Sequence, residues 1–168
     1  MNRSLAILTL LLLLCAAGLG GCAASIGQVQ SSYDKFKGTQ FDAMTISPRG
    51  TKLVRFQEGK LSPTYAFVLL YLLSGKGGPS RPSEMIFIAD GQRLSLRGDS
   101  ILEDVSVSRY GVSYNETGYF PVAPDQIRTL ANAKALEFRL YMNNAEDPQG
   151  PISEPTKQAM QQFYDQFV

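Results

Sequence analysis

The chain has 168 residues, and its 16 lysines and arginines against 15 aspartates and glutamates give a formal net charge of +1. This balance offers no basic excess for nucleic acid and no acidic excess for cationic partners. Histidine is absent, which excludes Ser-His-Asp and Cys-His catalysis and removes the commonest metal ligand. We therefore predict a protein that is not an enzyme, with no catalytic, metal-binding or cofactor-binding residues and no nucleic-acid partner.

The N-terminal segment has the pattern of a secretory signal peptide. Arg3 is the only charged residue before Asp34, residues 5–19 are rich in Leu, Ile and Ala, and small residues follow. The alternative is an uncleaved transmembrane anchor, because residues 5–24 just reach the roughly 20 residues of a spanning helix. The small residues and glycines in the last third favour cleavage.

Leu19-Gly20-Gly21-Cys22 resembles the lipobox of bacterial lipoproteins. The resemblance implies that the leader is cut before Cys22, that the Cys22 sulfur carries a diacylglycerol, and that the new N-terminus is acylated with a fatty acid such as palmitate. Cys15 then belongs to the discarded leader. Ala23 is not the Asp that retains such proteins in the inner membrane. In a Gram-negative host the resemblance implies the outer membrane, at its periplasmic face or the cell surface.

We divide the chain into a signal peptide (1–21), the lipidated cysteine with a flexible tether (22–32), and one globular domain (33–168). Removal of the leader leaves 147 residues with 15 basic and 15 acidic side chains, so the mature chain is formally neutral. Its only cysteine is Cys22, so no internal disulfide is possible. We expect a monomeric domain.

Strands dominate the first half of the domain. The pattern predicts strands at 41–46, at 52–57, and at 65–73, with a turn over 47–50 and a hairpin connection at 58–60. Residues 65–73 are all apolar, which is typical of a central strand covered on both faces. A buried helix is the alternative for this run.

The clearest local signal is the hairpin at 85–96. Asp90-Gly91 separates two runs of strand-forming residues and suits a type I′ turn, in which both central residues have positive φ. A strand with one polar face follows at 105–108. Gly111 then marks a bulge or a break before residues 112–114.

The C-terminal part alternates helix and strand. We predict a helix at 124–133, a half-exposed strand at 136–142, and a loop at 143–151. Ser153 is the expected N-cap of a final helix. Its apolar residues recur at i, i+3, i+4 and i+7 and so predict one buried face: Met160, Phe163, Tyr164 and Phe167.

These elements predict an α+β fold with one antiparallel sheet of about six or seven strands and two helices on one face. A β-sandwich with a C-terminal helix is the alternative. The body is similar to small bacterial lipoproteins of unknown function at residues 33–38, 88–91 and 124–141. That similarity implies no activity.

Our functional hypothesis is a membrane-anchored, non-enzymatic binding or assembly module of the cell envelope, with an envelope protein as a possible partner. The alternative is a carrier of lipid or another apolar ligand, for which one face of residues 65–73 would line a cavity. A carboxylate-only hydrolase remains a third hypothesis, and it requires two carboxyl groups about 5–9.5 Å apart across a cleft.

Overall fold

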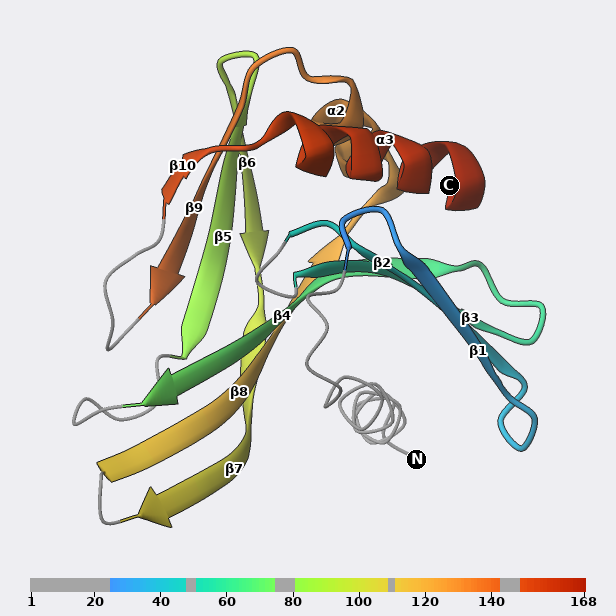
Figure 1. The fold of residues 1–168 in the computed structure, drawn as a ribbon. Coiled ribbons are helices and arrows are strands. Elements are labelled where there is room, and N and C mark those ends of the chain that lie inside the picture. Colours follow the sequence, from blue (N-terminus) through green and yellow to red (C-terminus); the bar gives the residue numbers. More distant parts are fainter. Residues whose placement is uncertain (1–24, 48–50, 75–80, 109–110, 143–148) are drawn as a thin grey trace.

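The computed structural model describes residues 25–47, 51–74, 81–108, 111–142 and 149–168. These residues form ten strands and two helices (Figure 1). The predicted signal peptide and Cys22 lie outside the described residues. Within the described residues, no helix is both long enough and apolar enough to cross a membrane.

Six strands form one antiparallel sheet in the order β1-β2-β3-β4-β8-β7. Its members are β1 (Val29–Asp34), β2 (Thr39–Thr45), β3 (Lys52–Glu58), β4 (Thr64–Ser74), β7 (Asp99–Ser108) and β8 (Gly111–Val122). Figure 1 shows that this sheet is strongly curved.

Four strands form a second antiparallel sheet in the order β10-β9-β5-β6. Its members are β5 (Pro82–Ala89), β6 (Gln92–Arg97), β9 (Leu136–Met142) and β10 (Gln149–Pro151). It stands steeply against the six-stranded sheet (Figure 1).

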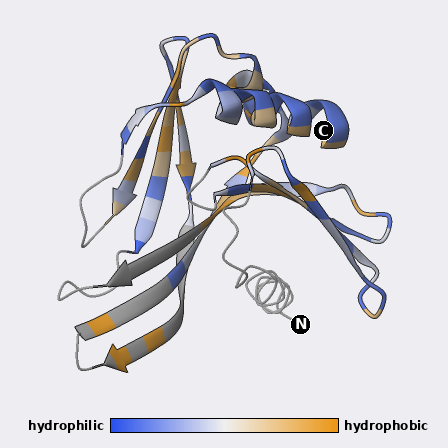
Figure 2. Ribbon diagram, viewed as in Figure 1, coloured by the Kyte–Doolittle hydropathy of each residue, from blue (hydrophilic) through white to orange (hydrophobic). Residues whose placement is uncertain are grey.

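The two helices, α2 (Pro124–Asn132) and α3 (Glu154–Phe167), lie together on one side of the six-stranded sheet, beside the four-stranded one (Figure 1). The Ser153 hydroxyl accepts a hydrogen bond from the Thr156 N–H at 3.4 Å, as expected of the predicted N-cap. The outer side of α3 is mostly hydrophilic, while hydrophobic segments recur along the strands (Figure 2).

The predicted α+β class, with antiparallel strands and a C-terminal helix, is confirmed. The strands are divided between two sheets and do not form the single sheet predicted from the sequence. Gly98 is the corner: β6 ends at Arg97 and β7 begins at Asp99, so one residue carries the chain from one sheet to the other.

Gly98 is required at this corner because no side chain fits there. A Cβ on this residue would lie 2.4 Å from the Tyr119 carbonyl oxygen and 2.5 Å from Cδ1 of Phe120. Its N–H also donates to the Ser83 carbonyl at 3.1 Å. The absence of a side chain therefore lets β6 and β7 cross close to β8.

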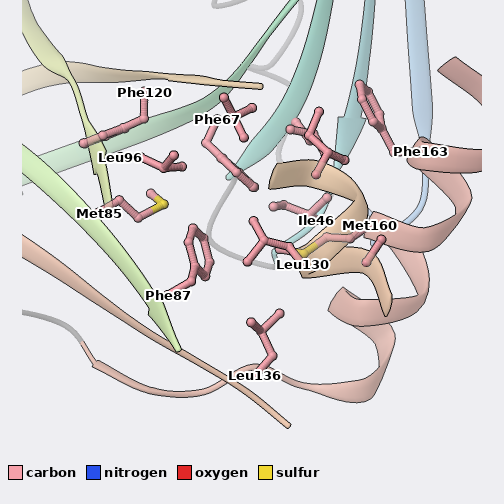
Figure 3. Packing of buried hydrophobic residues seen from close by; sticks show 14 of the residues in the cluster. Ile46, Phe67, Met85, Phe87, Leu96, Phe120, Leu130, Leu136, Met160 and Phe163 are labelled. Carbon is pink, nitrogen blue, oxygen red and sulfur yellow. The ribbon is translucent and has the colours of Figure 1, made fainter. Parts of the chain in front are cut away.

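The main core lies between the two sheets and the two helices. Figure 3 shows side chains from all of these layers in one cluster: Ile46, Phe67, Met85, Phe87, Leu96, Phe120, Leu130, Leu136, Met160 and Phe163. Phe163 of α3 is fully buried and meets Tyr65 of β4 edge-on, with ring centroids 6.3 Å apart. The predicted buried face of the final helix is confirmed at Met160 and Phe163, and Tyr164 and Phe167 are partly buried against the same core.

The Asp90-Gly91 turn has the predicted geometry, with φ of 48° and 83° at its two residues. Asp90 also joins this hairpin to the loop after α2. Its carboxylate accepts backbone hydrogen bonds from Ala135 at 2.8 Å and Lys134 at 3.2 Å, and these bonds lower the pKa of Asp90 below the usual 3.8.

Two segments predicted to be irregular contain strands. Residues 29–32, expected in the flexible tether, belong to β1, because β2 offers them a complete antiparallel register from Val29 to Asp34. The end of the predicted loop at 143–151 forms the short strand β10, which pairs with β9 at residues 137–139. Gly111, which was predicted to mark a bulge or a break, is the first residue of β8. The register shift between β7 and β8 lies elsewhere, between Leu102 and Asp104.

β4 is an interior strand, as predicted, and it is buried on both faces over residues 65–69. On the helix side it contributes Tyr65, Phe67 and Leu69 to the main core. On the opposite side Ala66 and Val68 join a second apolar cluster. The six-stranded sheet therefore carries apolar side chains on both faces.

Candidate functional site

Cys22, the one functional residue predicted from the sequence, lies outside the described residues, so its lipidation stays a prediction. The described chain joins the sheet soon afterwards. The Gly27 N–H donates to the Thr45 carbonyl at 2.8 Å, and the Thr45 N–H donates to the Gln28 carbonyl at 3.1 Å. The predicted anchor is therefore only a few residues from the fixed part of the domain.

A second apolar cluster lies on the face of the six-stranded sheet away from α2 and α3. It consists of Phe41, Ala43, Val54, Phe56, Ala66 and Val68, with Tyr119 packed against it. Phe56 links its neighbours, because its ring centroid lies 5.0 Å from Phe41 and 6.4 Å from Tyr119. This cluster extends to one end of the sheet.

An apolar groove of about 830 Å³ opens at that end. It is formed by the start of β2, the end of β3, the start of β4, the end of β8 and the turn between β3 and β4. Its lining includes Phe56, Leu61, Thr64, Tyr119, Pro121 and Val122. We call this the β3–β4 groove.

The groove exists because small side chains stand between large ones. Thr39 and Thr64 are short, and they lie on the same face of the sheet as the rings of Phe56 and Tyr119. Leu61 projects from the turn and is 58% exposed. The turn residues and the end of β8 therefore form walls around a floor of short side chains.

Polar groups lie at the rim of the groove. Lys37 and Glu58 supply one charge of each sign, and Ser62 supplies a hydroxyl. Burial raises the pKa of the Tyr119 hydroxyl above its usual 10.0, so this phenol is protonated at neutral pH and can donate a hydrogen bond. The groove thus combines an apolar interior with polar groups at its edge.

Carboxylates are sparse in the described lining of the groove. Among the described lining residues of the β3–β4 groove, Glu58 is the only carboxylate, so a pair of facing carboxylates is not formed there. Across the described parts of the chain, no group of three His, Cys, Asp or Glu is placed to hold a metal ion.

A second hollow, of about 470 Å³, lies on the outer face of the four-stranded sheet. Ile86 and Ile88 form its floor, and charged side chains of both signs surround them: Arg93, Glu137 and Arg139. The Arg139 guanidinium stacks on Tyr141 at 4.6 Å from the ring centroid. Mixed charge on an open sheet face selects no ligand class, so this hollow is a weaker candidate.

Two buried carboxylates have structural partners. Asp42 on β2 is 4% exposed and accepts hydrogen bonds from Arg55 at 2.9 Å, Ser31 at 2.7 Å and Gln40 at 3.0 Å. Glu116 on β8 is 1% exposed and accepts from the backbone N–H of Arg81 at 3.0 Å. Because both carboxylates are engaged within the fold, we assign them to its stability.

Comparison with known proteins adds no family. No protein-family model, no curated protein and no solved structure matches the chain. The functional argument therefore rests on the sequence and on the geometry described above.

The groove was only partly foreseen. The alternative hypothesis, a carrier of an apolar ligand, required a cavity along one face of residues 65–73. Thr64 and Tyr65, at the start of β4, are the residues of that strand that line the groove. Phe56 and Tyr119 were not singled out, because they become neighbours only when β3 and β8 pair with opposite edges of β4. The available signal was the apolar alternation of β3, which places Val54 and Phe56 on the face opposite Leu53.

Proposed function

We propose that the chain is a lipid-anchored protein of the bacterial cell envelope, attached through Cys22, and that its domain is a non-enzymatic binding module for an apolar ligand. The anchor part of the proposal is supported by the lipobox-like Leu19-Gly20-Gly21-Cys22 after an apolar leader. Two acyl chains on one residue suffice for stable attachment, whereas a single chain does not.

The β3–β4 groove is the observation that supports ligand binding. Its volume of about 830 Å³ falls in the range of roughly 300–1,000 Å³ that is usual for small-molecule sites. Each methylene group buried there would contribute about 0.8 kcal/mol. The aromatic rings of Phe56 and Tyr119 offer apolar surface, and Lys37 at the rim offers a cation to a carboxylate or phosphate head group.

An acyl chain fits this arrangement better than a compact polar ligand. The chain would lie against the rings of Phe56 and Tyr119, and its polar end would stay at the rim beside Lys37. The Tyr119 hydroxyl, protonated at neutral pH, would donate to an oxygen of the ligand. The proposal thus combines the two hypotheses from the sequence, a binding module and a carrier of apolar ligands.

The test is native mass spectrometry of the full chain released from detergent after incubation with oleate. Thr64→Trp fills the groove from an exposed position on the same face as Ala66. We expect one oleate bound to the wild type and an affinity about tenfold lower in this variant, a loss of about 1.4 kcal/mol. Ser95→Trp, at an exposed strand position of the other sheet, is the matched control and should bind as the wild type does. Equal binding by all three proteins would refute the assignment of the groove.

A further inference from the structure

Two neighbouring turns project from one end of the six-stranded sheet (Figure 1). The turn between β1 and β2 spans residues 35–38, and the turn between β3 and β4 spans residues 59–63. Thr39 pairs with Glu58 in the register of β2 and β3, and the Gly59 N–H donates to the Gly38 carbonyl at 2.9 Å. The two turns are therefore held side by side.

These turns and the adjacent end of β1 expose large apolar side chains. Phe36 is 89% exposed, Tyr33 is 63% exposed, and Leu61 is 58% exposed. Single exposed apolar residues are common on protein surfaces. Phe36 and Leu61 lie on the two adjoining turns, and Tyr33 lies near the end of β1. We call these three exposed residues the turn patch (Tyr33, Phe36 and Leu61).

Three lysines lie on the same two turns. Lys35, Lys37 and Lys60 are all exposed, and the Lys35 ammonium lies 5.1 Å from the centroid of the Phe36 ring. Two carboxylates lie near them. Asp34 accepts hydrogen bonds from the N–H groups of Phe36 at 2.9 Å and Lys37 at 3.3 Å, and Glu58 ends β3. The turns and the strand ends beside them therefore carry three positive and two negative side chains.

We propose that the turn patch is a contact surface for an anionic phospholipid bilayer. Aromatic side chains favour the head-group level of a membrane, and lysines beside them can reach phosphates while their stems stay in apolar surroundings. Each lysine near an anionic surface contributes about 1 kcal/mol of attraction. Exposed apolar side chains with lysines beside them thus match the chemistry of this partner, and the five charged side chains sum to a net charge of +1.

The position of the groove supports the same partner. Lys37 and Leu61 belong to the two turns and also line the β3–β4 groove. A bilayer in contact with the turn patch would therefore lie at the mouth of the groove. This step rests on the proposed function of the groove, whereas the contact surface itself does not require it.

The proposed anchor permits this orientation. From Cys22 to Gly27, where the chain is fixed to β2, the chain reaches about 18 Å when extended. β1 then covers about 20 Å from Val29 to Asp34. If β1 lies along the membrane, the turn patch reaches the bilayer that holds Cys22. This orientation rests on the proposed lipidation, so the experiment measures the environment of the turn patch itself.

The chain contains no tryptophan, so one substitution provides a unique fluorescent probe. We would place Phe36→Trp in the turn patch, and Gln92→Trp, exposed beside the turn of the β5–β6 hairpin, as the control. The full chain of each variant is reconstituted into vesicles of phosphatidylcholine with phosphatidylglycerol, some carrying brominated acyl chains. Both variants keep the same N-terminus, so a difference between them reports on the patch and not on the anchor.

We expect a blue shift of the Phe36→Trp emission, quenching by the brominated chains, and protection from acrylamide, with none of these for Gln92→Trp. Vesicles of phosphatidylcholine alone, or the added changes Lys35→Gln and Lys60→Gln, should reduce the shift. Equal exposure of both probes to acrylamide on anionic vesicles would overturn the proposal. Shielding of Phe36→Trp that requires membrane proteins and fails on pure lipid would overturn it in favour of a protein partner. If the chain is labelled with fatty acid at Cys22 but the Phe36→Trp side chain stays exposed to water, the proposed lipidation would hold and the proposed contact surface would be refuted.

Discussion

Phe163→Ala is expected to be one of the most destabilising single changes in α3. The ring is fully buried and lies 6.3 Å from Tyr65 and 5.0 Å from Phe167, measured between centroids. The Tyr65 hydroxyl in turn donates to the Phe167 carbonyl at 2.8 Å, which fastens the last turn of the helix to β4. The change removes the centre of this contact.

The magnitude follows from burial. Truncation of a buried Phe to Ala costs about 3–5 kcal/mol, which is a large share of the roughly 5–15 kcal/mol that stabilises a domain. A helix of 14 residues is marginal alone, so its stability depends on this apolar face. For a domain of this size the loss corresponds to a melting temperature lower by roughly 10–20 °C.

Thermal unfolding followed by circular dichroism, with urea unfolding as a second measurement, provides the assay. Gln158→Ala is the control, because it changes an exposed residue of the same helix to a better helix former. It should move the melting temperature by no more than a degree or two. Small and equal shifts in both variants would show that α3 does not depend on its packing against the sheets, contrary to our reasoning.

Three further predictions concern the corner, the hairpin and the leader. Gly98→Ala should lower the free energy of unfolding, measured with urea, by about 1–3 kcal/mol. The reason is that its Cβ would lie 2.4 Å from the Tyr119 carbonyl oxygen, so the backbone must shift. An unchanged free energy of unfolding would contradict the close approach of residue 98 to β8. The pKa of Asp90 is lowered in the folded state by hydrogen bonds from Ala135 and its neighbour, so its contribution is present above about pH 4 and is lost as the pH falls through the folded pKa. Asp90→Asn should therefore lower the free energy of unfolding at neutral pH and converge with the wild type in acid, whereas a difference that is constant with pH would argue against the charge. Cys22→Ser should leave an unprocessed precursor and abolish labelling by a fatty-acid probe, and normal maturation of this variant would remove the lipoprotein interpretation.

Features that depend on local sequence were predictable. The Asp90-Gly91 turn needs positive φ at two successive residues, and few sequences meet that condition. The final helix was defined by its Ser153 cap and by the spacing of Met160 and Phe163. In both cases the determining residues lie within a few positions of one another, so no long-range contact was needed to predict them.

Features that depend on distant pairing were not predictable. The pairing of β5 with β9, which are separated by β6, β7, β8 and α2, sets the second sheet. No local sequence pattern distinguishes this pairing from one in which β5 joins the other strands in a single sheet. The corner at Gly98 is required by the backbone of β8, and glycine alone does not reveal which strand passes close to it. The groove likewise arises where the β3–β4 turn meets the end of β8, so its lining comes from separate parts of the chain.

Photo-crosslinking is the measurement that tests the central claim most directly. The full chain in its membrane is incubated with a palmitic acid that carries a diazirine on its acyl chain, irradiated, and digested for mass spectrometry. The account predicts adducts at the walls of the β3–β4 groove, in the peptides that contain residues 61–65 and 119–124, and their loss in Thr64→Trp. Adducts confined to the outer face of the four-stranded sheet, or unchanged labelling in Thr64→Trp, would contradict the proposal that this groove binds an apolar ligand.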